Sequence, residues 1–307
     1  MKSPGKSFFV KKLFLILYFI LSTTAFTFQP QTLLDDMGVP FSLTVPPKRI
    51  ISLSPNITEI LFALGKEDRL VGVTRFCDYP EKAQEKEKIG GMVDPNIEKI
   101  ISLKPDLILA FRGNPLSAIE RLRALNCPVF VLDQGNTLES LFPMIEKIIQ
   151  VTHAQEQGEE LLQNLNNQFK EIKTALNGIE KKPRVFLSLH GGELWTCGQD
   201  SFLHDLITQA GGMNIAEKVK KPWFPLREEE LLVSNPEIIV ILASSGKIFS
   251  QAKKEFLENP VYKEITAVKE KEIYYLDENL SSRLSPRIIT ALRRLARIFH
   301  TKRFSST

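Results

Sequence analysis

The chain has 307 residues, of which 43% are hydrophobic and 25% are charged, with 40 Lys and Arg against 36 Asp and Glu. This composition is typical of a folded soluble protein, and it excludes a disordered chain and a protein with many membrane spans. Four lysines and no acids lie in the first 25 residues, so the remainder has 36 residues of each charge (40 minus 4, against 36). This balance gives no reason to expect a nucleic acid partner.

Residues 1–25 have the layout of a secretory signal peptide. The four lysines precede an apolar run at 13–21, and small residues at 22–25 offer a cleavage site. The apolar run is shorter than the roughly 20 residues that a spanning helix needs. We expect a cleaved signal, and the alternative is an uncleaved N-terminal anchor. No cysteine lies near the expected cleavage point, so a lipid anchor is not expected.

Short apolar strands and helices alternate in the first half of the chain. This alternation predicts a doubly wound, mainly parallel sheet. The expected strands lie at 49–53, 70–74, 107–111 and 127–132, with helices at 56–65 and 116–125.

The pattern changes near the middle of the chain. Leu162, Leu165, Phe169, Ile172 and Leu176 are spaced by 3, 4, 3 and 4 residues, and mostly polar residues lie between them. This spacing predicts one amphipathic helix that ends near residue 177 and is roughly 25 Å or more in length. Such a helix would join two halves of the chain stiffly.

The second half begins another α/β series. Strands are expected at 184–189 and 272–276, and a glycine-bearing loop follows the first of them. A final helix is expected to begin at Ser285 as the N-cap, with Pro286 in the first turn. We therefore predict a signal peptide at 1–25, an N-terminal α/β lobe at 26–150, an inter-lobe helix at 151–180 and a C-terminal α/β lobe at 181–307.

One unit occurs twice, at 92–110 and at 223–242. In each copy an acid, Glu98 or Glu229, opens a short helix, and a proline and a strand of Ile, Leu and Val follow. Matching positions differ by 131 residues, which suggests two similar lobes with a cleft between them. The alternative is that such units recur by chance in α/β proteins.

The usual sequence motifs of catalysis and of phosphate or dinucleotide binding are absent from the chain. None of the histidines, His153, His190, His204 and His300, has a His or Cys partner at metal-ligand spacing, so no metal site and no intrinsic cofactor are predicted. An exported enzyme with His190 and Glu193 as acid and base is a remote alternative.

The chain has three cysteines, Cys77, Cys127 and Cys197. Their odd number and wide spacing allow one disulfide at most, and we expect free thiols.

Aromatic and soft side chains lie on loops that follow the expected strands. In an open parallel sheet, ligands bind at the carboxyl ends of the strands. These side chains therefore favour a ligand cleft, although they could instead seal the core of each lobe. They are Phe76, Tyr79, Met92, Trp195 and Trp223.

Several of these segments resemble the cobalamin-binding periplasmic proteins of ABC importers, within the helical-backbone class that also carries siderophores and haem. The resemblance covers about residues 48–299. It is carried by RIISLSPNITEILFALG (49–65), VGVTRFCDYP (71–80), NIEKIISLKPDLILAFRG (96–113), KPWFPLREEELLVSNPEIIVI (221–241) and SRLSPRII (282–289).

The resemblance implies a fold of two Rossmann-like lobes with mainly parallel sheets, joined by one long rigid helix, the class III fold. It also implies a non-enzymatic, periplasmic protein that is a monomer when free and captures cobalamin or a related corrinoid between its lobes. The same transport role for haem or a ferric siderophore is the alternative, because Met92 and Asn279 depart from the family pattern. The implied ligand contacts are Phe76, Met92, Trp195, Trp223, Asn279 and Arg283.

Docking residues are implied as well. Glu98 and Glu229 match lobe-tip acids that pair with arginines of a two-fold symmetric ABC permease, which works with ATPase subunits. The alternative is that both acids serve only their helix dipoles.

Overall fold

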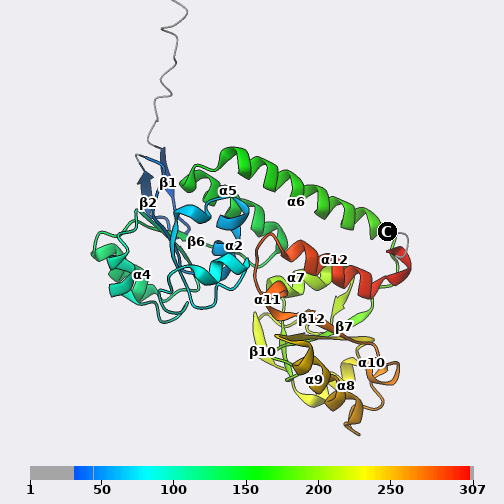
Figure 1. The fold of residues 1–307 in the computed structure, drawn as a ribbon. Helices are drawn as coiled ribbons and strands as arrows, with labels where there is room; N and C mark the ends of the chain where they lie inside the picture. The colour runs from blue at the N-terminus through cyan, green and yellow to red at the C-terminus, as the bar shows by residue number, and fades with distance from the viewer. Residues whose placement is uncertain (1–30, 44, 305–307) are drawn as a thin grey trace, which may run out of the picture.

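The computed structural model describes residues 31–43 and 45–304, so the expected signal peptide lies outside the described residues. Two α/β lobes lie side by side, and the long helix α6 (Gln155–Ala175) runs along both of them (Figure 1). The predicted α/β fold is confirmed. None of the helices in the described residues is long and apolar enough to cross a membrane.

The N-terminal lobe contains a four-stranded parallel sheet in the order β4-β3-β5-β6. These strands are almost wholly buried because helices cover both faces, which explains their continuous apolar sequences. The strands are β3 (Ile50–Ser52), β4 (Leu70–Val73), β5 (Leu107–Phe111) and β6 (Val129–Leu132). The helices are α2 (Pro55–Ala63), α3 (Ile97–Ser102), α4 (Leu116–Ala124) and α5 (Leu141–Thr152).

The C-terminal lobe repeats this plan with a parallel sheet in the order β9-β7-β11-β12. In both sheets the strand order is therefore second, first, third, fourth along the chain. The strands are β7 (Arg184–Ser188), β9 (Met213–Asn214), β11 (Ile238–Ala243) and β12 (Ile273–Asp277). The helices are α7 (Phe202–Gln209), α8 (Glu228–Ser234), α9 (Gly246–Glu258), α10 (Thr266–Lys269), α11 (Glu278–Ser281) and α12 (Ile288–Phe299).

The helix predicted from the 3, 4, 3, 4 spacing is α6. Leu165 and Ile172 on its apolar face are buried in a core that contains residues of both lobes. On the outer side, Arg293 of α12 donates a 3.2 Å hydrogen bond to Glu171 of α6. This packing ties the C-terminal lobe to the helix along its length.

Two antiparallel pairs supplement the sheets. The pair β1 (Gln31–Leu34) and β2 (Pro40–Leu43) extends the N-terminal lobe, where Phe41 packs edge-on against Phe130 of β6 at 5.3 Å. The second pair, β8 (Trp195–Cys197) and β10 (Trp223–Pro225), belongs to the C-terminal lobe.

The prediction for the start of the last helix was wrong. Helix α12 begins at Ile288, after Ser285 and Pro286. The Ser285 hydroxyl is buried and donates a 2.6 Å hydrogen bond to Glu59 of the other lobe. Ser285 therefore connects the lobes, and its hydroxyl also accepts a 3.4 Å hydrogen bond from the Arg287 amide just before the helix.

Candidate ligand-binding cleft

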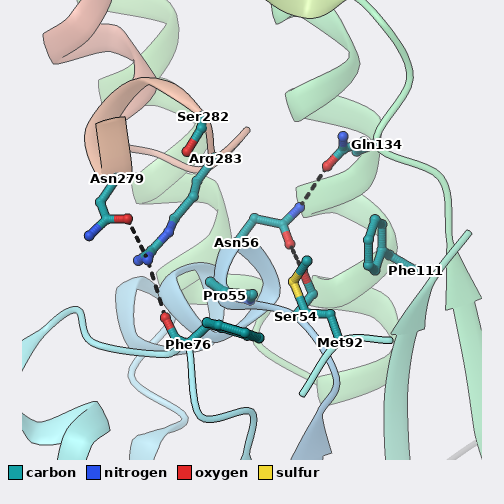
Figure 2. Close-up of a pocket in the computed structure, with 10 residues that line it drawn as sticks. All are labelled: Ser54, Pro55, Asn56, Phe76, Met92, Phe111, Gln134, Asn279, Ser282 and Arg283. Atoms are coloured by element: carbon teal, nitrogen blue, oxygen red, sulfur yellow. Dashed lines mark hydrogen bonds between the residues drawn. The ribbon is translucent and has the colours of Figure 1, made fainter. Parts of the chain in front are cut away.

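Two cavities lie next to each other between the lobes, and Ser282 lines both. We call them the N-side cavity, of about 390 Å³, and the C-side cavity, of about 280 Å³. The N-side cavity is lined by Ser54, Pro55, Asn56, Phe76, Met92, Phe111, Gln134, Asn279, Ser282 and Arg283 (Figure 2). The C-side cavity is lined by Leu189, His190, Trp195, Leu203, Trp223, Leu242, Glu278 and Ser282.

The order of the strands explains why several residues that line the N-side cavity lie close together. Ser54 and Asn56 follow β3, Phe111 ends β5 and Gln134 follows β6, so all lie at the carboxyl edge of the sheet. The cavity lies where the strand order reverses, as is usual for ligand sites in open α/β sheets. Asn56 donates a 3.3 Å hydrogen bond to the Gln134 carboxamide oxygen, which holds the two amides together (Figure 2).

Met92 is held at the cavity wall by a buried amide. The Asn114 Nδ2 group donates to the Met92 carbonyl at 2.9 Å and to the Leu53 carbonyl at 3.1 Å. Its Oδ1 atom accepts from the Phe111 amide at 2.9 Å. Asn114 thereby fixes the loop after β5 against the loop that carries Met92, a role that the sequence analysis did not assign.

The strand pair β8 and β10 presents both tryptophans on one face. Trp223 lies opposite Cys197, and Pro225 lies opposite Trp195, so these four side chains share one side of the ribbon. The intervening Phe224 points into the core of the lobe and is buried. Trp195 and Trp223 remain 39% and 41% exposed at the C-side cavity, as expected for surfaces that a ligand covers.

The last loop supplies polar groups to the cleft. Asp277 caps α11 by accepting a 2.8 Å hydrogen bond from the Leu280 amide. This short helix brings Asn279 to the N-side cavity and Glu278 to the C-side cavity, and Arg283 in the loop after it lines the N-side cavity. There Glu278 lies 3.8 Å from His190, so Glu278 is the carboxylate nearest to this ring in the described structure, in place of the expected Glu193.

Arg283 reaches across the cleft into the loop that carries Phe76. Its Nη1 atom donates to Glu59 at 3.0 Å and to Asp78, and its Nη2 atom donates to the Phe76 carbonyl and to Asn279 Oδ1, both at 3.1 Å. Figure 2 shows the guanidinium between Asn279 and the Phe76 carbonyl. Burial alone would lower the pKa of Arg283, but the bonds to Asp78 and Glu59 raise it above its usual range.

Glu59 is the buried centre of this inter-lobe cluster. It is only 4% exposed, and it accepts hydrogen bonds from Arg283, Ser285 and, at 2.6 and 2.9 Å, Arg287. The Arg287 guanidinium also lies over the Tyr79 ring at 3.7 Å. The sequence analysis gave Glu59 no role. The available signal was an acid in the apolar first half of a helix, where a charge needs a partner.

The cleft therefore combines aromatic surfaces with amides and hydroxyls at the N-side cavity, and with the Glu278 carboxylate and the His190 ring at the C-side cavity. Among the described residues that line the two cavities, Arg283 is the one lysine or arginine, and its charge is opposed by Glu59 and Asp78. Within the described part of the chain, His, Cys, Asp and Glu do not gather into a group that could hold a metal ion. This chemistry suits a large, flat, uncharged ligand.

The predicted ligand contacts divide between the cavities. Phe76, Met92, Asn279 and Arg283 line the N-side cavity, and Trp195 and Trp223 line the C-side cavity. Glu98 on α3 and Glu229 on α8 are both exposed in the first turn of their helices and line neither cavity.

A bilobed α/β protein with a parallel sheet in each lobe, one long connecting helix and an aromatic cleft between the lobes is a substrate-binding protein by architecture. The sequence pattern of the family described as "Periplasmic binding protein" matches residues 50–280, and the chain belongs to this family. It is a class III substrate-binding protein of an ABC importer and not an enzyme. Such proteins work with a membrane permease and its ATPase subunits.

Two relatives show how the chain compares with known sequences. A vitamin B12-binding protein of Photorhabdus laumondii is 32% identical over 255 residues, which cover 83% of this chain and 88% of that protein. The uncharacterized ABC transporter substrate-binding lipoprotein YvrC of Bacillus subtilis is 29% identical over 281 residues, covering 90% and 87%.

Two solved structures are similar along most of the chain. The periplasmic vitamin B12-binding protein BtuF of Vibrio cholerae is 27% identical with a TM-score of 0.74, covering 85% of this chain and 99% of that one. The periplasmic heme-binding protein BhuT, solved with two hemes, is 25% identical with a TM-score of 0.75, covering 82% and 99%. The predicted class III fold is confirmed by these likenesses.

Proposed function

We propose that this protein captures cobalamin or a related corrinoid in the inter-lobe cleft and delivers it to an ABC permease. The observation that carries the proposal is the charge of the cleft. Its lining offers amides and hydroxyls from Ser54, Asn56, Gln134, Asn279 and Ser282, while its one guanidinium is already neutralised. A corrin ring edged by carboxamide side chains matches these groups in hydrogen bonding and in charge.

The aromatic side chains suit the same ligand. Phe76 is 46% exposed at the N-side cavity, and the two tryptophans lie at the C-side cavity. Flat aromatic surfaces on both sides of a cleft can pack against a macrocycle and bury a large apolar area. Met92, in place of an aromatic ring, adds a flexible apolar surface that adapts to an uneven ring face.

Haem or a ferric siderophore is the alternative ligand. Haem carries two carboxylates and many ferric siderophore complexes are anionic, and anionic groups need cations or several free donors in a cleft. Arg283 donates to four protein acceptors and offers little to such groups. The heme-binding relative supports the alternative by its fold and identity, but the polar lining favours the corrinoid.

Ligand identity is tested by titration of the purified protein. Tryptophan fluorescence is followed with cyanocobalamin, haemin and a ferric siderophore, and calorimetry gives the affinities. We expect saturable quenching by cyanocobalamin at micromolar or lower concentration, with weaker binding of the other two. Trp223→Ala is expected to weaken cyanocobalamin binding, whereas Val233→Ala, at an exposed position on α8, is the control. Tighter binding of haemin than of cyanocobalamin by the wild-type protein would refute the corrinoid proposal.

We further propose that Glu98 and Glu229 dock the protein onto the permease. Both acids are exposed, and each lies at the second position of the short helix before the third strand of its lobe. Two equivalent carboxylates on two similar lobes suit a partner with two-fold symmetry and a basic residue on each half.

For location, we infer export to the periplasm through the segment at 1–25. The support is its basic and apolar layout, together with membership of the periplasmic binding protein family. Cell fractionation with N-terminal sequencing of the mature protein tests the inference, and labelled palmitate distinguishes a free protein from a lipid-anchored one. Recovery in the cytoplasm with an intact N-terminus would refute it.

A further inference from the structure

We propose that Asp78 and Glu59 are specificity-determining residues, which neutralise Arg283 and so set the cleft to prefer uncharged over anionic ligands. This inference rests on the proposed function, because it concerns the ligand of the same cleft. Neither acid was predicted as a site residue. Both come from the N-terminal lobe, whereas Arg283 comes from the C-terminal lobe.

Most of the hydrogen-bond donors of Arg283 are used by acceptors within the protein. A guanidinium has five N–H donors. Both Nη atoms of Arg283 are directed at protein acceptors, namely Glu59 and Asp78 from Nη1, and the Phe76 carbonyl and Asn279 from Nη2. The Nε–H group is the donor left for a ligand, so Arg283 contributes little free charge or hydrogen bonding to the cleft.

Glu59 and Asp78 balance the charges of two arginines, Arg283 and Arg287. Glu59 is buried and also accepts two hydrogen bonds from Arg287 and one from Ser285. Arg287 therefore balances much of the Glu59 charge, and Asp78 is the second acid that Arg283 needs. With two carboxylates and two guanidiniums, the cluster is neutral. Loss of the Asp78 charge leaves one net positive charge at the wall of the N-side cavity.

Asp78 is close enough to the cleft for its charge to act on a bound ligand. Its side chain is 42% exposed at the edge of the cleft. Its Oδ2 atom accepts a 2.9 Å hydrogen bond from Asn279, which itself accepts from Arg283. Asp78, Asn279 and Arg283 thus form a closed ring of hydrogen bonds across the cleft. Arg283 in this ring also donates to the Phe76 carbonyl. The same hydrogen bonds therefore balance the charge of Arg283 and hold Phe76 at the cavity wall.

Arg75 and Lys88, two other cations beside this loop, also have protein partners. Arg75 lies 5.0 Å from the Phe76 ring and makes two 2.9 Å hydrogen bonds with Asp94. Lys88 donates to the carbonyls of Cys77 and Ala83 and lines neither cavity. Pairing of both arginines that flank Phe76 is consistent with a cleft from which free positive charge is excluded.

The test uses two ligands that differ by one charge. Cyanocobalamin is neutral, and its monocarboxylate, made by hydrolysis of one propionamide, carries one negative charge. Calorimetry gives both dissociation constants for the wild-type protein and for Asp78→Asn, which keeps the size of the side chain. We expect the wild-type protein to prefer the neutral ligand, and Asp78→Asn to reduce this preference by about tenfold at low ionic strength. The difference should shrink in high salt.

Two further variants keep the test valid if Asp78→Asn does not fold. Asn279→Asp adds an acid beside Arg283 and is expected to increase the preference for the neutral ligand. Glu171→Gln removes the partner of Arg293 at the contact between α6 and α12, away from both cavities, and should leave the preference unchanged. Circular dichroism establishes that each variant is folded. An unchanged preference in Asp78→Asn and Asn279→Asp would overturn the inference.

Failure of the proposed function gives a different result. If the wild-type protein binds neither corrinoid, the proposed ligand is wrong. Haemin and its dimethyl ester then replace the corrinoid pair, because they again differ in charge on one scaffold. If Asp78→Asn increases the affinity for haemin relative to that for its ester, the role of Asp78 is supported. An unchanged ratio of the two affinities overturns it.

Discussion

Arg49 and Arg184, at the starts of the first parallel strands of the two lobes, make matching hydrogen bonds through their Nε–H groups and their backbone amides. The Arg49 Nε–H group donates to the carbonyls of Leu103 and Lys104, and the Arg184 Nε–H group donates to those of Ser234 and Asn235. The backbone amides of the two arginines donate to Asp106 and to Glu237. Each pair of acceptors differs by 131 residues, so the duplication extends from the sequence into the side-chain contacts.

This equivalence predicts a stabilising substitution at Lys104. Lys104 and Asn235 occupy matching positions, and both have left-handed backbones, with φ of 47° and 40°. Asparagine tolerates this conformation better than lysine, so Lys104→Asn should raise the free energy of unfolding by about 0.5–1 kcal/mol. Urea denaturation measures the change. Lys173→Asn, within helix α6, is the matched control and should lower stability, because asparagine is the poorer helix former. A loss of stability in Lys104→Asn would contradict the prediction.

A second prediction concerns the cost of removing Glu59. Glu59→Ala leaves the guanidiniums of Arg283 and Arg287 without their shared carboxylate in a largely buried place. Loss of one partner from a buried charge pair costs about 3–5 kcal/mol of stability. Glu171→Ala breaks the exposed pair with Arg293 and should cost less than about 1 kcal/mol. Urea unfolding of both variants makes the comparison, and equal midpoints would show that the inter-lobe cluster is not structural.

Local patterns predicted the parts of the fold that depend on local sequence. The offset of 131 carries residues 97–102 of α3 onto 228–233 of α8, and residues 107–111 of β5 onto 238–242 of β11. The 3, 4, 3, 4 spacing predicted α6 because an amphipathic helix repeats at short range.

Contacts between distant residues were not predictable in the same way. Ser285 has the sequence context of an N-cap, but its hydroxyl bonds to Glu59, 226 residues earlier. The charge balance around the Arg283 guanidinium likewise depends on Asp78, 205 residues away. The resemblance assigned Arg283 to the cleft, and the structure adds the acids that balance its charge.

The cysteines give a prediction about reactivity. Burial raises the pKa of Cys197 to about 12 and also raises the pKa of Cys77 and of the less buried Cys127. A raised pKa keeps each thiol protonated and unreactive at pH 8. Ellman's reagent should therefore react slowly with the native protein, first at Cys127, and with three thiols in denaturant. Immediate reaction of Cys77 or Cys197 in the native protein, identified by mass spectrometry, would contradict their burial.

The proposed docking residues predict a separation of transport from binding. In Glu98→Arg with Glu229→Arg, both lobe tips change from negative to positive, so each repels a basic residue of the permease. Vitamin uptake in cells, or ligand-stimulated ATP hydrolysis with the reconstituted transporter, should be lost. Ligand affinity should stay within about twofold of wild type, because neither acid lines a cavity. The matched control is Glu120→Arg, at an exposed acid on α4, which should support normal uptake. Normal uptake by the double variant would refute docking through these two acids, and loss of ligand binding would show that the tips and the cleft are not independent.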